Sequence, residues 1–244
     1  MITDLQAVIW DFGGVLTSSP FEAFTRYEEE RGLPTDFVRS VNAVNIQENA
    51  WAKLERSEVN ADEFDVLFRD ESRALGHEVP GKDILGLLSG SVRPSVVNAL
   101  KVCKSKVKVG CITNNAPVGK GAGMSSDANK AAQVSEIMTL FDHVIESSKL
   151  GIRKPDPRIY RLAAEQMGFA PSHCVVIDDA IVGVQAGLDA GMQVIIGNIS
   201  TMLGGDDYSV NPHGFVSQVF HCNLRFAVRP HPVRTLVFPG VCQL

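Results

Sequence analysis

Residues 7 to 16 read Ala7-Val8-Ile9-Trp10-Asp11-Phe12-Gly13-Gly14-Val15-Leu16, and this stretch decides how the fold is interpreted. Its first four residues are apolar and predict a short buried strand, with Asp11 following at the carboxyl end. In open α/β sheets, ligands bind at the carboxyl ends of the strands, and glycines there let backbone N–H groups approach a ligand closely. Taken alone, the stretch fits better with a turn aspartate ahead of a flexible loop.

Further apolar runs recur along the chain and alternate with helical patterns. Strands are predicted at Ala7–Trp10, Val107–Ile112, Val144–Ile145, Cys174–Ile177 and Val194–Ile196. Helices are predicted at Ser95–Lys104, Asn129–Leu140, Pro157–Met167 and Val182–Ala190. Asp156 is expected to cap the third of these helices, with Pro157 in its first position. This alternation predicts an α/β fold, a Rossmann-like parallel sheet covered by helices on both faces.

The stretch from about Ser18 to Ser89 interrupts the alternation. It contains no convincing strand and predicts several helices, one of them opened by a capping box of Asn60 and Glu63. A long helical segment after the first strand is better explained as an inserted subdomain than as a single crossover, and it would lie over the carboxyl ends of the strands. We therefore expect two units: a core of residues 1–17 and 90–197, and a helical cap of residues 18–89.

The composition is that of an ordinary soluble globular chain of 244 residues. Lys and Arg number 23 against 28 Asp and Glu, a formal net charge of −5. We expect no nucleic-acid partner, because such proteins need a basic face for the phosphates. We also expect no membrane partner, because no apolar run approaches the roughly 20 residues of a membrane helix. The segment Met1–Asp4 lacks the basic region of a signal peptide.

The five cysteines form no CxxC pair and are best explained as buried apolar residues in a reduced protein, so we expect a cytoplasmic location. Residues 198–244 contain several prolines and neither lysine nor glutamate. They form a tail whose structure the sequence leaves uncertain, between short strands and irregular chain. The oligomeric state is not indicated.

Polar residues also follow the second and fourth predicted strands. Thr113-Asn114 offers a hydroxyl and an amide, which suit an anion or an ordinary cap. Lys154 precedes a predicted helix N-terminus, which favours an anion, although a solvated surface lysine would fit in isolation. Asp178-Asp179 follows a buried strand, where two acids are costly unless a cation or hydrogen-bond donors offset them. Hard oxygen ligands of this kind suit Mg²⁺.

The order of these residues resembles that of the haloacid dehalogenase (HAD) superfamily over roughly Gln6 to Gly197. The resemblance rests on four segments: Trp10 to Leu16, Ile112-Thr113-Asn114, Gly151 to Tyr160, and Ile177-Asp178-Asp179. The chain is most similar to the subgroup that contains the N-terminal phosphatase domain of soluble epoxide hydrolases. In that subgroup, too, a stretch like Glu146-Ser147-Ser148 precedes the loop that carries the lysine, which we call the lysine loop (here residues 151–156). The resemblance implies an HAD core with an inserted helical cap and a Mg²⁺-dependent hydrolase of a small phosphorylated substrate.

The resemblance also implies a role for each residue. Asp11 would be the nucleophile that becomes an aspartyl-phosphate. Lys154 would stabilise the charge on nucleophile and phosphate, and Thr113 and Asn114 would hold the phosphate oxygens. For Mg²⁺ it implies ligands on the two acidic strand ends: Asp11, Asp179 directly, Asp178 in support, and the backbone carbonyl of Gly13.

One position departs from the family pattern. HAD phosphatases usually carry a second aspartate two residues after the nucleophile as general acid and base, and here Gly13 stands there. Such help is worth roughly 100- to 10,000-fold, so its loss predicts a slow enzyme or a non-catalytic domain that binds a phosphorylated ligand or a protein partner. Haloacid dehalogenases also lack this acid, but they lack an acidic pair like Asp178-Asp179. Dehalogenation is therefore the less favoured alternative.

Overall fold

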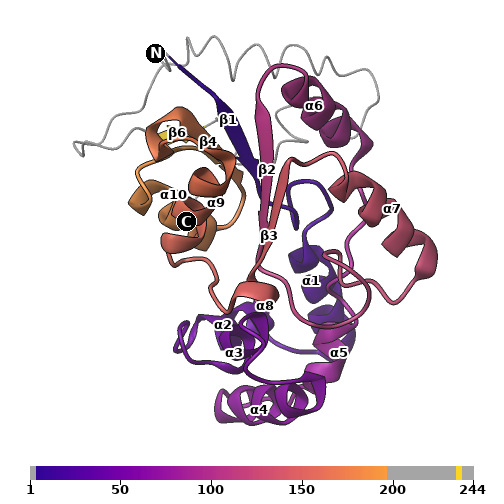
Figure 1. The fold of residues 1–244 in the computed structure, drawn as a ribbon. Coiled ribbons are helices and arrows are strands. Elements are labelled where there is room, and N and C mark those ends of the chain that lie inside the picture. The colour runs from indigo at the N-terminus through magenta and orange to yellow at the C-terminus, as the bar shows by residue number, and fades with distance from the viewer. Residues whose placement is uncertain (1–3, 197–234, 238–244) are drawn as a thin grey trace.

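The structure is a computed structural model that describes residues 4–196 and 235–237. Its sheet consists of parallel strands in the order β3-β2-β1-β4-β5-β6 (Figure 1). The strands are β1 Ala7–Trp10, β2 Lys108–Thr113, β3 His143–Glu146, β4 Cys174–Asp178, β5 Gln193–Ile196 and β6 Thr235–Val237. The predicted α/β parallel sheet is confirmed. Strand β6 lies in the tail, where the sequence predicted no particular strand.

Helices cover both faces of this sheet (Figure 1). They are α6 Pro94–Lys104 and α7 Ala128–Met138 on one face, and α9 Arg158–Met167 and α10 Ile181–Asp189 on the other. Successive strand residues enter opposite layers: Val8 and Trp10 join the cluster under α6 and α7, while Ala7 and Ile9 join the cluster under α9 and α10. Burial on both faces is the reason for the near-continuous apolar runs in the sequence.

Helix α9 begins one residue later than the sequence predicted. Pro157 is the N-cap residue, with φ −65° and ψ −16°, and the helix itself starts at Arg158. Asp156 still serves this end of the helix, because its carboxylate accepts a hydrogen bond from the Arg158 N–H at 2.9 Å. The predicted cap is therefore right in its chemistry and wrong by one position.

Between β1 and α6 the chain forms only helices: α1 Pro20–Arg31, α2 Phe37–Ala43, α3 Ala50–Glu55, α4 Ala61–Ala74 and α5 Gly81–Leu85. They bury an apolar cluster in which Phe64 and Phe68 are fully buried and to which Ala116, from the segment after β2, also belongs. The predicted capping box is present, since Asn60 accepts from the Glu63 N–H and Glu63 accepts from the Asn60 N–H. We call residues 18–89 the cap; its status as a separate subdomain stays a prediction.

The register of the sheet places two acidic residues next to each other. Trp10 of β1 pairs with Cys111 of β2 on one side and with Ile177 of β4 on the other. Asp11 directly follows β1 and Asp178 is the last residue of β4, so they lie side by side at the carboxyl edge. The Asp11 N–H donates to the Ile177 carbonyl at 2.8 Å, which extends the ladder to the acid itself.

The cysteines of the described residues are buried, as the sequence predicts. Cys103, Cys111 and Cys174 are buried free thiols, and burial raises the pKa of each. Cys222 and Cys242 lie outside the described residues. None of the helices in residues 4–196 combines the length and apolar character needed to cross a bilayer.

Candidate active site

Three acids meet at the carboxyl edge of the sheet. Carboxylate oxygens of Asp11, Asp178 and Asp179 all lie within 4.8 Å of one another. The approach of Asp179 requires a glycine at position 14, because a Cβ there would lie 2.2 Å from Asp179 Oδ2 and the glycine φ is +81°. The two-glycine stretch after β1 therefore makes room for the acid that follows β4.

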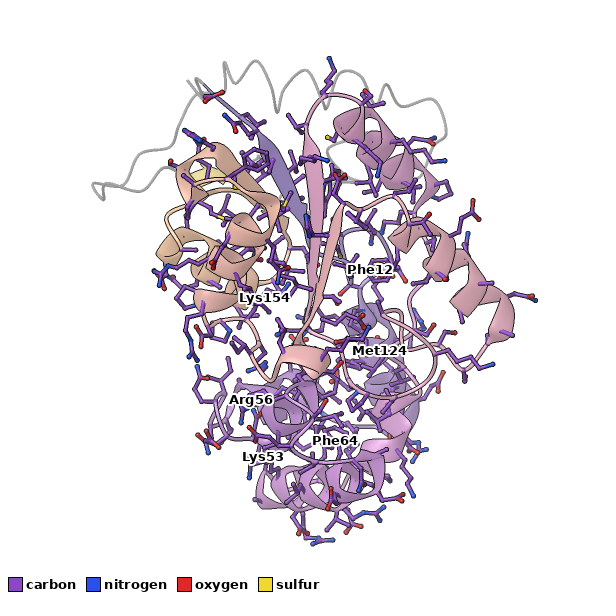
Figure 2. All side chains as sticks on the ribbon, in the orientation of Figure 1. Phe12, Lys53, Arg56, Phe64, Met124 and Lys154 are labelled. Carbon is purple, nitrogen blue, oxygen red and sulfur yellow. The ribbon has the colours of Figure 1, made fainter. Side chains whose placement is uncertain are left out.

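Lys154 joins two of these acids. Its Nζ donates to Asp11 Oδ1 at 2.6 Å and to Asp178 Oδ2 at 2.8 Å, and the side chain is 3% exposed. Burial opposes the charged ammonium, but the adjacent carboxylates of Asp11 and Asp178 outweigh it and raise the pKa of Lys154. Figure 2 shows Lys154 at the end of the sheet that faces the cap, above Arg56 and Phe64.

Asp178 is fully buried and accepts hydrogen bonds from several donors. Besides Lys154, it accepts from the Tyr160 hydroxyl at 3.0 Å and from the Ala180 N–H at 2.9 Å. A Cβ at Gly183 would lie 1.9 Å from Asp178 Oδ2, so α10 approaches the acid closely only because it carries a glycine there. These contacts fix Asp178 as an anchor for Lys154, and no sequence pattern predicted the hydrogen bond from Tyr160.

The charge balance of the site favours a cation. Burial raises the pKa of Asp11 to about 8, with a further contribution from Asp178 and Asp179 that Lys154 opposes. Burial and the charge of Asp178 raise the pKa of Asp179 to about 6. Three carboxylates against one ammonium leave the ionised cluster with excess negative charge. A divalent cation with hard oxygen ligands fits this donor set.

The residues at the carboxyl end of β2 are only partly available for the phosphate role that the resemblance implies. Thr113 ends β2 and is buried. The side chain of Asn114 is committed to the protein: Nδ2 donates to Glu55 Oε2 and to the Lys154 carbonyl, and Oδ1 accepts from the Lys154 N–H. The phosphate contacts of Thr113 and Asn114 stay a prediction. Asn115, to which the sequence assigned nothing, ties β2 to Glu146 at 2.7 Å.

The site has open space at Gly13. No atom of the described residues lies within 4 Å of a Cβ placed at this position, and the φ of Gly13 lies outside the left-handed range, in contrast to that of the adjacent Gly14. The position that carries the general acid in most HAD phosphatases is therefore sterically free for a side chain. The absence of the acid is a property of the sequence and not of a crowded backbone.

This ordered set of Asp11, Lys154 and Asp178-Asp179 on a parallel sheet has known counterparts. A family model described as haloacid dehalogenase-like hydrolase matches residues 5–191. The chain belongs to this family. The HAD assignment suggested by the sequence is confirmed.

Relatives with assigned names include phosphatases. The chain is 28% identical over 207 residues to phosphorylated carbohydrates phosphatase of Thermotoga maritima, covering 82% of this chain and 88% of that protein. It is 26% identical over 203 residues to mouse bifunctional epoxide hydrolase 2, covering 79% of this chain. The chain spans only 36% of the length of the mouse protein.

Solved structures show the same fold. The magnesium-bound HAD hydrolase YfnB of Bacillus subtilis aligns with a TM-score of 0.57 at 16% identity, covering 90% of this chain and all of that chain. At this identity the similarity establishes the fold alone.

Two further buried residues of this region were not singled out by the sequence analysis. Glu55 lies in the cap and contacts both Asn114 and Arg153, the residue before Lys154. Glu55 occurs in the run Lys53-Leu54-Glu55-Arg56, which has the composition of an exposed helix end. No local pattern distinguishes this carboxylate from the exposed carboxylate of Glu58, three residues later.

Proposed function

We propose that this protein is a Mg²⁺-dependent phosphatase of a small phosphorylated substrate, with Asp11 as the nucleophile. The observation that carries the proposal is the position of Lys154, whose buried ammonium contacts Asp11 and Asp178 while Asp179 completes the acidic cluster. A lysine in this place orients the nucleophile and offsets charge that a phosphate would bring. The phosphatase of Thermotoga maritima supports a phosphorylated substrate, and the magnesium-bound YfnB supports the metal.

The reaction follows from these groups. A carboxylate oxygen of Asp11 forms a bond to phosphorus while the bond to the leaving oxygen breaks, and water then hydrolyses the aspartyl-phosphate. Lys154 stabilises charge on Asp11 and the phosphoryl oxygens, and Thr113 and Asn114 are proposed to hold those oxygens. Asp11, Asp179, the Gly13 carbonyl and supporting Asp178 would hold Mg²⁺, which supplies the positive charge that lets a carboxylate approach a phosphate dianion.

The leaving oxygen needs a proton, and position 13 does not provide one. This favours substrates whose leaving group has a low pKa, since these depart without full protonation. It also supports a second candidate function, a non-catalytic domain that binds a phosphorylated ligand or partner. Haloacid dehalogenation is less favoured because the acidic pair Asp178-Asp179 has no role in it. A cytoplasmic location and a small-molecule partner belong to the same proposal.

A panel of phosphate esters and acyl phosphates assayed with Mg²⁺ tests the proposal. Asp11→Asn should lower phosphate release by several orders of magnitude, because a nucleophile is removed. Asp70→Asn, which changes an exposed acid of α4, is the matched control and should leave the rate unchanged. Equal rates in wild type and Asp11→Asn, or none in either, would refute the phosphatase. Mg²⁺-dependent binding of a phosphate ester without turnover would support the second candidate.

A further inference from the structure

Glu55 is a cap residue with an unusual environment for a carboxylate. It is the last residue of α3 and is 6% exposed. Its Oε2 accepts from Arg153 Nε at 2.5 Å and from Asn114 Nδ2 at 3.1 Å, and its Oε1 accepts from Trp51 Nε1 at 2.8 Å. A buried charge is costly unless donors and an opposite charge surround it, and Glu55 has both.

Glu55 and the backbone of Lys154 require the same orientation of the Asn114 amide. An ionised carboxylate can only accept hydrogen bonds, so the NH₂ group of Asn114 must face it. The same amide nitrogen donates to the Lys154 carbonyl at 3.0 Å, and the amide oxygen is then left to accept from the Lys154 N–H at 2.9 Å. Asn114 thus binds both the N–H and the C=O of Lys154, in the orientation that the Glu55 carboxylate stabilises further.

Arg153 provides a second path from the cap to the same lysine. Its guanidinium is buried and contacts Glu55, while Nη1 donates to the Ile46 carbonyl at 3.0 Å. Both partners belong to the cap, and Arg153 immediately precedes Lys154. A further contact joins Ser57 of the cap to the Ser148 carbonyl in α8 (Ser147–Leu150) at 2.7 Å. The lysine loop is therefore held by several contacts from the cap.

We infer that Glu55 is a positioning residue through which the cap aims Lys154 at Asp11. Glu55 touches neither acid, but it fixes Asn114 and Arg153, and these fix the backbone on either side of the Lys154 N–H. The position of the catalytic lysine then depends on how the cap packs against the core. The inference rests on the proposed function only where it calls Lys154 catalytic; the positioning itself is a property of the fold.

Kinetics of Glu55→Gln provide the first test. The glutamine has the same size but carries no charge and no fixed preference for the Asn114 orientation. We expect kcat on the best substrate of the panel to fall about 10- to 100-fold, because misplacement of a catalytic group by about 1 Å has effects of this order. KM should change much less. Glu58→Gln is the matched control, since Glu58 pairs with Arg56 in the same segment but is exposed and makes no contact with the lysine loop.

A second variant separates positioning from simple loss of stability. Glu55→Gln leaves Arg153 buried without its charge partner, which destabilises the fold. The double variant Glu55→Met/Arg153→Met removes both charges and should unfold nearer to the wild-type temperature. Its kcat should stay low, because the contacts that hold Lys154 remain absent. Recovery of stability together with wild-type kcat would overturn the inference and reduce the ion pair to a structural role.

Hydrogen exchange gives a readout that needs no turnover. The Lys154 N–H donates to Asn114 Oδ1, so the peptide that contains residues 151–156 should exchange faster in Glu55→Gln than in wild type or Glu58→Gln. Unchanged exchange with unchanged kcat would overturn the inference. If wild type releases no phosphate from any substrate, the phosphatase proposal fails, and the exchange measurement alone decides whether Glu55 positions the lysine.

Discussion

The ammonium of Lys154 lies 2.6 Å from Oδ1 of Asp11, although 143 residues separate the two along the chain. The contact is buried, and the same ammonium reaches Asp178 at 2.8 Å. It ties β1 to β4 through a loop that belongs to neither strand. Lys154 therefore both stabilises the carboxyl edge of the sheet and offsets the charge of Asp11, the candidate nucleophile.

Lys154→Met should destabilise the protein in a pH-dependent manner. Removing the cation leaves Asp11 and Asp178 buried without their partner, a change that typically costs about 3–5 kcal/mol. The loss should be larger at pH 8 than at pH 5.5, since protonation of Asp11 relieves the unpaired charge at low pH. Urea unfolding at both pH values measures it. Lys149→Met, which removes an exposed lysine of the preceding helix α8, should change stability little, and equal losses in the two variants would contradict the explanation.

Mg²⁺ binding should release protons and weaken as the pH falls. In the metal-free fold the pKa of Asp11 is raised to about 8 and that of Asp179 to about 6, whereas the ion binds the deprotonated forms. The folded state holds these protons more tightly than the unfolded chain, so the contribution of these two acids to metal-free stability should fall as the pH rises from about 4 to 8. Added Mg²⁺ should raise the unfolding temperature more at pH 8 than at pH 6.

Calorimetry in buffers of different ionisation enthalpy measures the proton release directly. Removal of the ion with EDTA should restore the metal-free unfolding temperature. In Asp11→Asn the proton release near pH 7 should decrease, because one titrating ligand is gone. A Mg²⁺ effect independent of pH between 6 and 8 would contradict the assigned environment of the acids.

Gly13→Asp should fit the fold and increase activity. Among the described residues no atom lies within 4 Å of a Cβ at position 13, so the substitution should cause no steric destabilisation. A general acid at this place should raise kcat by roughly 100- to 10,000-fold on esters with poor leaving groups. Gly14→Asp is the opposite control, since its Cβ would lie 2.2 Å from Asp179 Oδ2 at a φ of +81°. A folded Gly13→Asp variant without any rate gain would show that the missing acid does not limit turnover.

Tyr160→Phe should weaken the anchor beneath Lys154. The variant removes one of the donors to the fully buried Asp178, which should cost about 1–3 kcal/mol. Burial and the charge of Asp178 hold the pKa of Tyr160 well above its usual value, so the hydroxyl remains a donor up to alkaline pH. Thermal unfolding measures the loss, with Tyr27→Phe as control, because the Tyr27 hydroxyl donates to the partly exposed Asp83. A loss no larger than that of the control would contradict the anchoring role.

Local sequence patterns were sufficient to predict the strands and helices of the core, but not the strand in the tail. The apolar runs of β1, β2 and β4 were recognisable because both faces of a parallel strand are buried, and the Asn60 capping box was recognisable because its geometry is local. Strand β6 was not anticipated, because three residues among several prolines carry no periodic signal. The shift at α9 arose because Pro157 fits either the cap or the first helical position.

By itself, the sequence determined the fold class and the convergence of Asp11, Lys154, Asp178 and Asp179, because strand ends of a parallel sheet share one edge. Only the tertiary structure decided which donor each acid meets and which neighbours hold the lysine. Glu55 and Arg153 are 98 residues apart, and Glu55 is the last residue of a short helix of the cap. A buried contact between a helix and a distant loop depends on how the two elements pack against each other. Neither hydrophobic periodicity nor a local motif encodes that packing.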